Sequence, residues 1–344
     1  MSSRSKLVGS QSVLPFFCEG CYYKKRGRCR GATNLKIYEM TGKSFVGCAT
    51  ENKTEFLYDI FKEYIPVGSS NQSKIVLPPY IPQFFSRKRE SILPLENRLV
   101  AISLTTFLNI TTGKIKFKNK SDLIRALGLP ANTKVALVGT CNDFILEKFW
   151  TISDTENLWR IIANFGFEFV TGLTLSVLDE LPLFSHKFNQ DRNFLSHDKF
   201  AYLGVPCIPF LMPFDEKDYE YIGVWLKDRT DVNIVAIHGS SYSRSPELFN
   251  ELINRMKKIE SLSPRHLKFL VVGIAKPNQM KILLNKFDST IINPRPFMEV
   301  IRAGNGYDAN LQITLDKQTP KDKLLFESIV NFENFCNAEM ALSD

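Results

Sequence analysis

Short apolar runs recur along the middle of this chain, and they limit its fold more than any other feature. Each run holds four to seven residues and is rich in Val, Ile, Leu and Phe. Apolar residues at successive positions are typical of strands that other elements cover on both faces. We therefore predict strands at Lys74–Pro78, Leu99–Leu104, Lys134–Gly139, Phe167–Leu173, Val205–Leu211, Asn233–Ile237, Lys268–Gly273 and Thr290–Asn293.

Helical patterns separate most of these runs. Ser245 followed by Pro246 is a typical helix start, and apolar residues recur after it with the period of a helix. Repeated strand–helix units predict a parallel sheet. The predicted strands are enough for a (β/α)8 TIM-like barrel, and an open doubly wound parallel sheet is the alternative. In either fold the functional side chains follow the C-terminal ends of the strands.

The chain divides into three regions. Residues 1–72 form a cysteine-rich, basic metal-binding region, 73–305 the α/β barrel, and 306–344 a C-terminal tail with one helix near Asp322–Ala338. No window is apolar for long enough to cross a membrane, and the N-terminus lacks the apolar core of a secretory signal. We therefore expect no membrane partner and a cytoplasmic or other reducing interior compartment.

Four of the 7 cysteines lie within the first fifty residues, in the order Cys18-x2-Cys21-x7-Cys29-x18-Cys48. A C-x2-C pair lets two thiolates bind one metal ion, and two further thiolates complete a tetrahedral set. In a reducing compartment such clustering predicts a metal site. Zinc is the favoured metal, and a [4Fe–4S] cluster is the alternative. Four unconnected buried thiols are the simpler interpretation.

A basic loop lies between the second and third of these cysteines. It contains two tyrosines, and the cations in and beside it are Lys24, Lys25, Arg26, Arg28 and Arg30. Cations interleaved with aromatic rings pair with phosphates and stack on bases, so the loop predicts binding of nucleic acid. The net charge of +8 favours the same class of partner. The alternative is that these cations only offset the charge of a four-thiolate site.

Spaced residues in the second half of the chain resemble a known family. Pro182, Asn189 and Arg192 give the spacing P-x6-N-x2-R, and the segments Gly204–Pro209, Val235–Gly239 and Phe269–Gly273 follow. In this order, over about residues 165–300, they resemble the bacterial, archaeal and phage family named domain of unknown function 4417. Where that family has an acidic strand end, this chain reads Thr171-Gly-Leu-Thr174. The resemblance implies a fold and a site position, and the family's association with phages and mobile elements implies a role near nucleic acid.

His238 directly ends an apolar run, where a barrel would place a general base or a phosphate donor. Together with Asp143 and Arg192 it makes up the predicted catalytic set. A structural histidine, and an aspartate that only caps a helix, are the simpler interpretations. Other polar residues at the predicted strand ends are Thr105, Thr106, Thr140, Asn142, Thr171, Thr174, Asp215, Ser241 and Asn293.

The predicted ligand-binding residues are Asn189, Ser240, Lys276 and Arg295. Asn189 and Arg192 are three apart and would share a helical face. Because a closed barrel returns its last strand to its first, we expect Asn189, Arg192, His238 and Arg295 to converge on one pocket that suits an anion.

The chain contains no G-x-x-x-x-G-K-[ST], G-x-G-x-x-G, H-E-x-x-H or G-x-S-x-G motif. The P-loop NTPases, Rossmann dehydrogenases, zincins and α/β-hydrolases are therefore disfavoured. Three hypotheses remain. The first is a nucleic-acid-associated barrel protein of a mobile-element or phage type, with a structural metal site and an anion-binding mouth. The second is a barrel enzyme acting on a small phosphorylated or carboxylated metabolite, and the third a non-catalytic interaction module.

Overall fold

The computed structural model describes residues 68–85, 92–109, 111–176, 183–315 and 318–342, and for 183–188 it describes the backbone alone. The main sheet contains β1 (Tyr80–Phe84), β2 (Leu99–Ser103), β3 (Lys134–Gly139), β4 (Val170–Leu173), β5 (Cys207–Ile208), β6 (Ile234–His238), β7 (Lys268–Val272) and β8 (Ser289–Asn293). A hairpin of β9 (Asn305–Tyr307) and β10 (Ile313–Leu315) follows.

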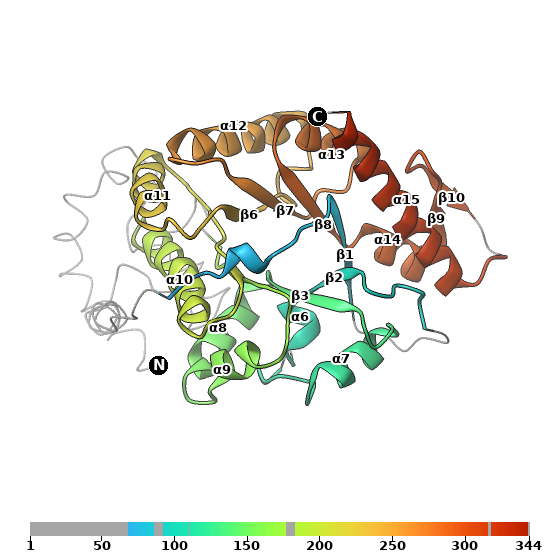
Figure 1. The fold of residues 1–344 in the computed structure, drawn as a ribbon, viewed down its shortest axis with the longest axis horizontal. Helices are drawn as coiled ribbons and strands as arrows, with labels where there is room; N and C mark the ends of the chain where they lie inside the picture. Colours follow the sequence, from blue (N-terminus) through green and yellow to red (C-terminus); the bar gives the residue numbers. More distant parts are fainter. Residues whose placement is uncertain (1–67, 86–91, 110, 177–182, 316–317, 343–344) are drawn as a thin grey trace, which may run out of the picture.

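Helices connect these strands and surround the sheet (Figure 1). In chain order they are η3 (Gln72–Lys74), α6 (Leu104–Phe107), α7 (Lys120–Leu127), α8 (Asp143–Ser153), α9 (Leu158–Ala163), α10 (Leu183–Tyr202), α11 (Glu216–Asp228), α12 (Pro246–Leu262), α13 (Pro277–Lys286), α14 (Arg295–Met298), η4 (Glu299–Ala303) and α15 (Lys321–Ala341). Ser245 caps α12 as predicted, because its side chain accepts a hydrogen bond from Leu248 N.

The sheet is an eight-stranded, all-parallel, nearly closed barrel of the TIM type. Its strand order is β5-β4-β3-β2-β1-β8-β7-β6, so the strands follow one another around the barrel in chain order. The two end strands, β5 and β6, meet at one bridge between Phe210 and Ala236. There Leu211 N donates to Ala236 O at 2.9 Å, and Ala236 N donates to Pro209 O at 2.8 Å. The alternative of an open doubly wound sheet is therefore wrong.

Seven of the eight predicted strands overlap observed ones, but the first prediction is wrong. The strand lies at Tyr80–Phe84, after the predicted Lys74–Pro78, and Pro82 within it pairs with Asn293 of β8. A strand in a parallel sheet gives alternate N–H groups to each neighbour, so one proline removes only one hydrogen bond. Ile75 and Leu77 instead pack against the interior of the barrel.

Side chains fill the barrel interior. Large rings at Phe169 and Phe210 meet small side chains at Ala101, Ala136 and Ala236, and all are at most 1% exposed. Large and small residues at facing positions interdigitate at the density of a protein core. The described interior is therefore packed at the middle, and the main cavity lies at the C-terminal ends of the strands.

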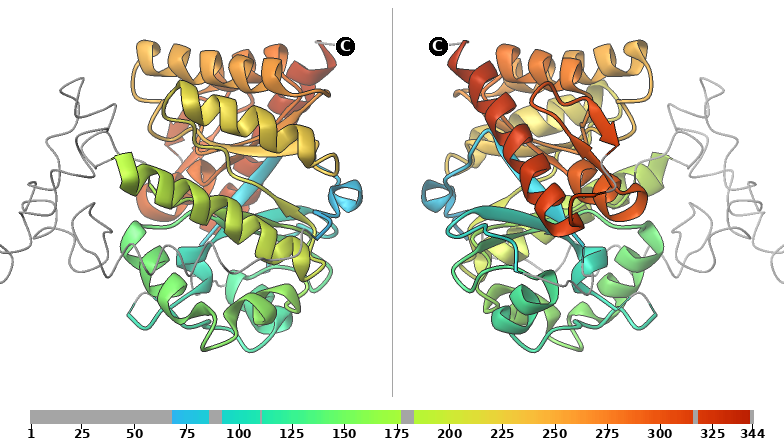
Figure 2. Two further views of the ribbon diagram at one scale, coloured as in Figure 1. Left: turned by 90° about the vertical axis from the view of Figure 1, so that its left-hand side faces the viewer. Right: turned by 90° about the vertical axis from the view of Figure 1, so that its right-hand side faces the viewer.

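The C-terminal helix α15 completes the shell of helices. Between β1 and β2 the described residues form no helix, and α15 covers this side of the barrel (Figure 2, right). Tyr80 of β1 packs against Phe332 of α15 with ring centroids 5.4 Å apart. Arg98, just before β2, forms an ion pair with Glu333. The helix predicted near Asp322–Ala338 is thus present, and it packs on the barrel.

Candidate binding site at the barrel mouth

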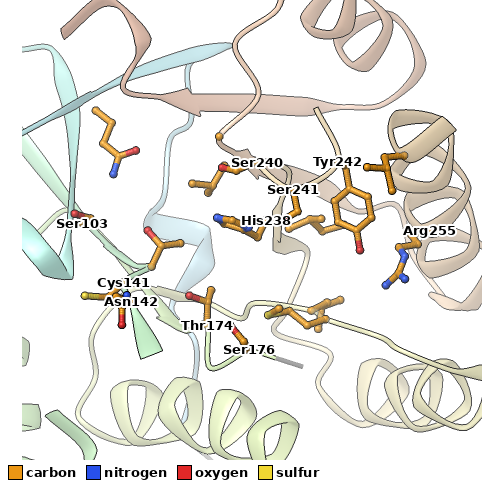
Figure 3. Close-up of a pocket in the computed structure, with 18 of the residues that line it drawn as sticks. Ser103, Cys141, Asn142, Thr174, Ser176, His238, Ser240, Ser241, Tyr242 and Arg255 are labelled. Carbon is orange, nitrogen blue, oxygen red and sulfur yellow. The ribbon is translucent and has the colours of Figure 1, made fainter. Parts of the chain in front are cut away.

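A cavity of about 750 Å³ opens at the C-terminal end of the barrel (Figure 3). Every strand of the main sheet contributes to its wall, either directly or through the residues that follow it. The polar lining residues are Gln83, Ser103, Thr105, Thr140, Cys141, Asn142, Thr174, Ser176, His238, Ser240, Ser241, Tyr242, Glu251 and Arg255. This volume lies within the usual range of about 300–1,000 Å³ for sites that bind small molecules.

Three polar side chains that belong to the strands face this cavity without a protein partner among the described residues. Gln83 of β1 is 6% exposed and Ser103 of β2 is 5% exposed, and neither side chain makes a hydrogen bond to a described residue. The imidazole of His238, at the end of β6, also has no such partner. Ser103 Oγ is fully buried, Gln83 is nearly so and His238 is half-buried, so these groups can bind a ligand or water in the cavity.

His238 lies near the centre of the cavity, between Ser103 and Cys141 at one end and Tyr242 and Arg255 at the other (Figure 3). Burial lowers the pKa of His238 below its usual value because the imidazolium loses solvation. The ring is therefore neutral at neutral pH, so it offers one acceptor and one donor nitrogen. A neutral imidazole in this position can accept a proton from a bound molecule.

Arg255 and Glu251 form the charged end of the cavity. Arg255 Nε and Nη2 donate to Glu251 Oε1 at 2.9 and 2.6 Å, and Nη1 donates to the carbonyl oxygen of Pro213. The guanidinium lies 5.3 Å from the ring centroid of Tyr242. These contacts occupy the cation, so it holds Tyr242 in place rather than offering a free positive charge.

Cys141 lines the opposite end, next to Thr105, with 3.0 Å between Sγ and the threonine Oγ1. Burial raises the pKa of the Cys141 thiol, and the hydrogen bond to Thr105 works against that shift. The thiol is therefore protonated at neutral pH and serves as a polar wall atom rather than as an activated nucleophile.

Side chains of α10 hold the segment that continues β4 into the mouth. Asn193 exchanges two hydrogen bonds with the backbone of Leu175, at 2.8 and 3.1 Å, and Ser196 Oγ accepts from the backbone of β4 at 2.7 Å. Asn189 Nδ2 donates to Ser176 O at 2.6 Å. These three side chains are four and seven positions apart and share one helical face. They take the place of a neighbouring strand and fix Thr174 and Ser176 at the cavity wall.

Arg192, which was predicted to be catalytic, is 2% exposed and does not line the cavity. Its Nη1 and Nη2 donate to the two carboxylate oxygens of Glu147 at 2.8 and 2.6 Å, and Nη2 also donates to Asn189 Oδ1 at 2.5 Å. Glu147 belongs to α8, so this bidentate pair ties α8 to α10 behind the mouth. Asn189 likewise lies behind the wall and acts on the cavity only through Ser176.

Asp143, the third member of the predicted catalytic set, is the first residue of α8. Its Oδ1 accepts from N and Oγ of Ser176 at 3.2 and 3.1 Å. Burial raises the pKa of the Asp143 carboxyl, while the bonds from Ser176 act in the opposite direction. Asp143 therefore holds Ser176 from one side while Asn189 holds it from the other.

The remaining predicted residues are dispersed. Arg295 forms a hydrogen bond with the Tyr307 hydroxyl at 2.9 Å and an ion pair with Glu299 at 2.8 Å, away from the cavity wall. Lys276 is the exposed N-cap of α13, whereas Ser240 lines the cavity. Of the four residues expected to converge on one pocket, only His238 lines it, so that expectation is wrong.

Sequence reasoning found the polar residues after the strands but missed two within them. Thr105, Thr140, Asn142, Thr174, Ser240 and Ser241 line the cavity as their positions suggest. Gln83 and Ser103 were overlooked, although each interrupts an apolar run. A polar residue inside a buried strand is the signal that identifies them.

The predicted metal and nucleic-acid residues lie outside the described residues. This applies to Cys18, Cys21, Cys29 and Cys48, and to Lys24, Lys25, Arg26, Arg28 and Arg30. Within the described part of the chain, no three His, Cys, Asp or Glu side chains cluster as metal ligands would. The metal prediction therefore rests on the cysteine spacing alone.

Comparisons with protein-family models and with curated proteins find no match to this chain. The resemblance over about residues 165–300 accordingly stays a prediction from residue spacing. No helix in the described ranges has the length and apolar character that a bilayer crossing requires.

Proposed function

We propose that this chain binds a small polar molecule in the barrel mouth and holds an exchangeable proton of that molecule against neutral His238. The observation that carries the proposal is the set of partnerless polar groups on β1, β2 and β6, namely Gln83, Ser103 and His238. Ser103 Oγ is fully buried without a described partner, which costs about 1–3 kcal/mol, and a ligand that pairs with it recovers that cost. The position also suits function, because TIM-barrel sites lie at the C-terminal ends of the strands.

A fragment screen tests this proposal. Ligand-observed NMR with the full chain should find small polar fragments that bind, and His238→Asn and Ser103→Val should weaken most of them. Arg302→Gln, a change outside the cavity lining, should leave binding unchanged. If no fragment binds, or if the hits bind the two mouth variants as well as wild type, the mouth is not the binding site.

The second part of the proposal concerns the basic region. We propose that Lys24, Lys25, Arg26, Arg28 and Arg30 bind nucleic acid beside a zinc site, with a [4Fe–4S] cluster as the alternative. The support is their clustering next to the four cysteines and the net charge of +8. This arrangement would suit a mobile-element or phage protein that acts near nucleic acid.

Binding of a labelled oligonucleotide tests that second part. Its affinity should fall steeply as salt rises, and neutralising Lys24, Arg26 and Arg28 together should weaken it and reduce the salt slope. Unchanged binding in this variant would favour the enzyme acting on a small phosphorylated or carboxylated metabolite. Absence of both oligonucleotide and fragment binding would favour a non-catalytic interaction module.

A further inference from the structure

We propose that the molecule bound in the mouth is a nucleobase, either free or as part of a nucleoside. This inference rests on the proposed function, because it names the ligand class of the same cavity. Three features of the cavity support it. They are the polar groups without a described partner, the aromatic rings of the wall and the mutual pairing of the wall's charges.

The edge of a nucleobase matches the amide of Gln83. A carboxamide presents one acceptor and two donors in a plane, and it forms two parallel hydrogen bonds with a ring edge that carries a donor next to an acceptor. Ser103 Oγ and the neutral His238 ring each add a group that donates and accepts. A sugar hydroxyl offers no such planar pair, so the amide distinguishes a base from a polyol.

The aromatic residues of the cavity wall provide surfaces for the face of a base. Phe85 follows Gln83 by two positions along the chain, and residues two apart on an extended segment point to the same side. Phe85 is fixed by Phe297, with ring centroids 5.5 Å apart. Tyr242, held by Arg255, lines the other end of the cavity. Stacking on such rings contributes to base binding in a way that tolerates different bases.

The charges of the described wall favour an uncharged ring. Glu251 and Arg255 neutralise each other, and His238 is neutral at neutral pH. Hydroxyls, amides and the protonated Cys141 thiol make up the rest of its polar surface. An uncharged base with several donors and acceptors satisfies these groups without bringing a charge into the barrel.

Calorimetric titration of the full chain with adenosine, guanosine, cytidine and uridine, and separately with ribose and glucose, tests the proposal. We expect at least one nucleoside to bind while ribose and glucose do not. Gln83→Met, which keeps the length of the side chain, should weaken that nucleoside by about tenfold or more. Phe85→Leu should weaken it by several-fold, because the flat ring is lost. Gln312→Met removes an exposed amide far along the chain and should leave binding unchanged.

Thermal unfolding shows whether the variants are folded. Gln83→Met should melt no lower than wild type, because Gln83 has no described hydrogen-bond partner to lose. If no nucleoside binds at millimolar concentration, the nucleobase proposal is overturned. It is also overturned if ribose or glucose binds as tightly as the nucleosides and Gln83→Met weakens all of them equally. In that second case a polar ligand still occupies the mouth, so the proposed function survives.

Discussion

The side-chain amide of Gln72 hydrogen-bonds to both backbone groups of Ile234 at the start of β6. Gln72 Nε2 donates to Ile234 O at 2.9 Å, and Gln72 Oε1 accepts from Ile234 N at 2.6 Å. The same Nε2 donates to Cys207 O of β5 at 3.0 Å. β5 and β6 are the two ends of the strand order and share only one backbone bridge, at Phe210. Gln72 therefore links β5 to β6 near the N-terminal ends of these two strands, where backbone pairing links the other strands of the barrel.

Replacing the Gln72 amide should destabilise the whole barrel. Gln72→Glu keeps the shape but cannot donate to the two carbonyl oxygens, and it buries a carboxylate against them. We expect a loss of about 2–4 kcal/mol in the free energy of unfolding. Urea unfolding followed by circular dichroism measures this, and Gln312→Glu on the surface should change it by less than about 0.5 kcal/mol. Equal urea midpoints for the two variants would show that β5 and β6 stay together without the hydrogen bonds of Gln72.

The buried pair of Arg192 and Glu147 predicts strong coupling between α10 and α8. Arg192→Met leaves the carboxylate of Glu147 enclosed without its partner, and we expect a loss of about 3–5 kcal/mol. Combining Arg192→Met with Glu147→Leu should recover most of that loss, since both charges are then absent. A double-mutant cycle from urea unfolding measures the coupling.

An exposed ion pair provides the control for that cycle. Lys323 and Glu327 of α15 are 67% and 49% exposed in their side chains. Lys323→Met should therefore change stability by less than about 1 kcal/mol. A loss of stability on Arg192→Met as small as that on Lys323→Met would contradict a structural role for the buried pair.

The N-terminal cysteines predict one bound metal per chain. Elemental analysis of protein purified under reducing conditions should find zinc, whereas a brown colour with visible absorption would identify an iron–sulfur cluster. Replacing Cys18 and Cys21 by Ser should remove the metal, while Cys141→Ser, at the barrel mouth, should retain it. Chelation should leave the melting of the barrel nearly unchanged, because the barrel core does not need the metal to fold. Metal retained by the Cys18→Ser/Cys21→Ser protein would refute this site.

The barrel could be predicted from the sequence because its strands are apolar on both faces. Runs such as Lys134–Gly139 are buried against helices outside and against side chains inside, so they read as continuous apolar segments. The first strand was misplaced because Pro82 counts against a strand in any local rule. Only the observed pairing with Asn293 reveals that a single missing N–H is tolerated there.

The candidate site was harder to predict, for a related reason. When both faces of a strand are apolar, the sequence does not reveal which face points into the barrel. A polar residue within such a strand marks Gln83 and Ser103 as unusual, but it does not show that their side chains face the cavity. The spacing of Asn189 and Arg192 correctly indicates a shared helical face. It does not indicate which neighbours that face meets, and in the structure they are Ser176, which follows β4, and Glu147. Arg295 follows the last strand as expected, but Tyr307 and Glu299 draw it away from the mouth.

The half-buried imidazole of His238 predicts a pH dependence with a definite sign. Burial lowers the pKa of His238 in the folded state, whereas the unfolded chain has the ordinary value of about 6.5. As pH falls through that ordinary value, the unfolded chain takes up a proton that the folded chain does not. The contribution of His238 to stability is therefore complete above about pH 7.5 and is lost as pH falls from there towards the folded-state pKa.

Urea unfolding of wild type and His238→Asn over a pH series measures this contribution. Taking the difference in the free energy of unfolding between the two proteins cancels the contributions of the other titrating groups. One of these is buried His197, whose pKa burial also lowers. We expect the free energy of unfolding of wild type, relative to His238→Asn, to fall with decreasing pH. An NMR titration of the His238 ring should show a pKa below the ordinary value of about 6.5. A relative stability that rises with decreasing pH would mean that an acidic group pairs with the ring, and His238 could not then accept a proton as a neutral base.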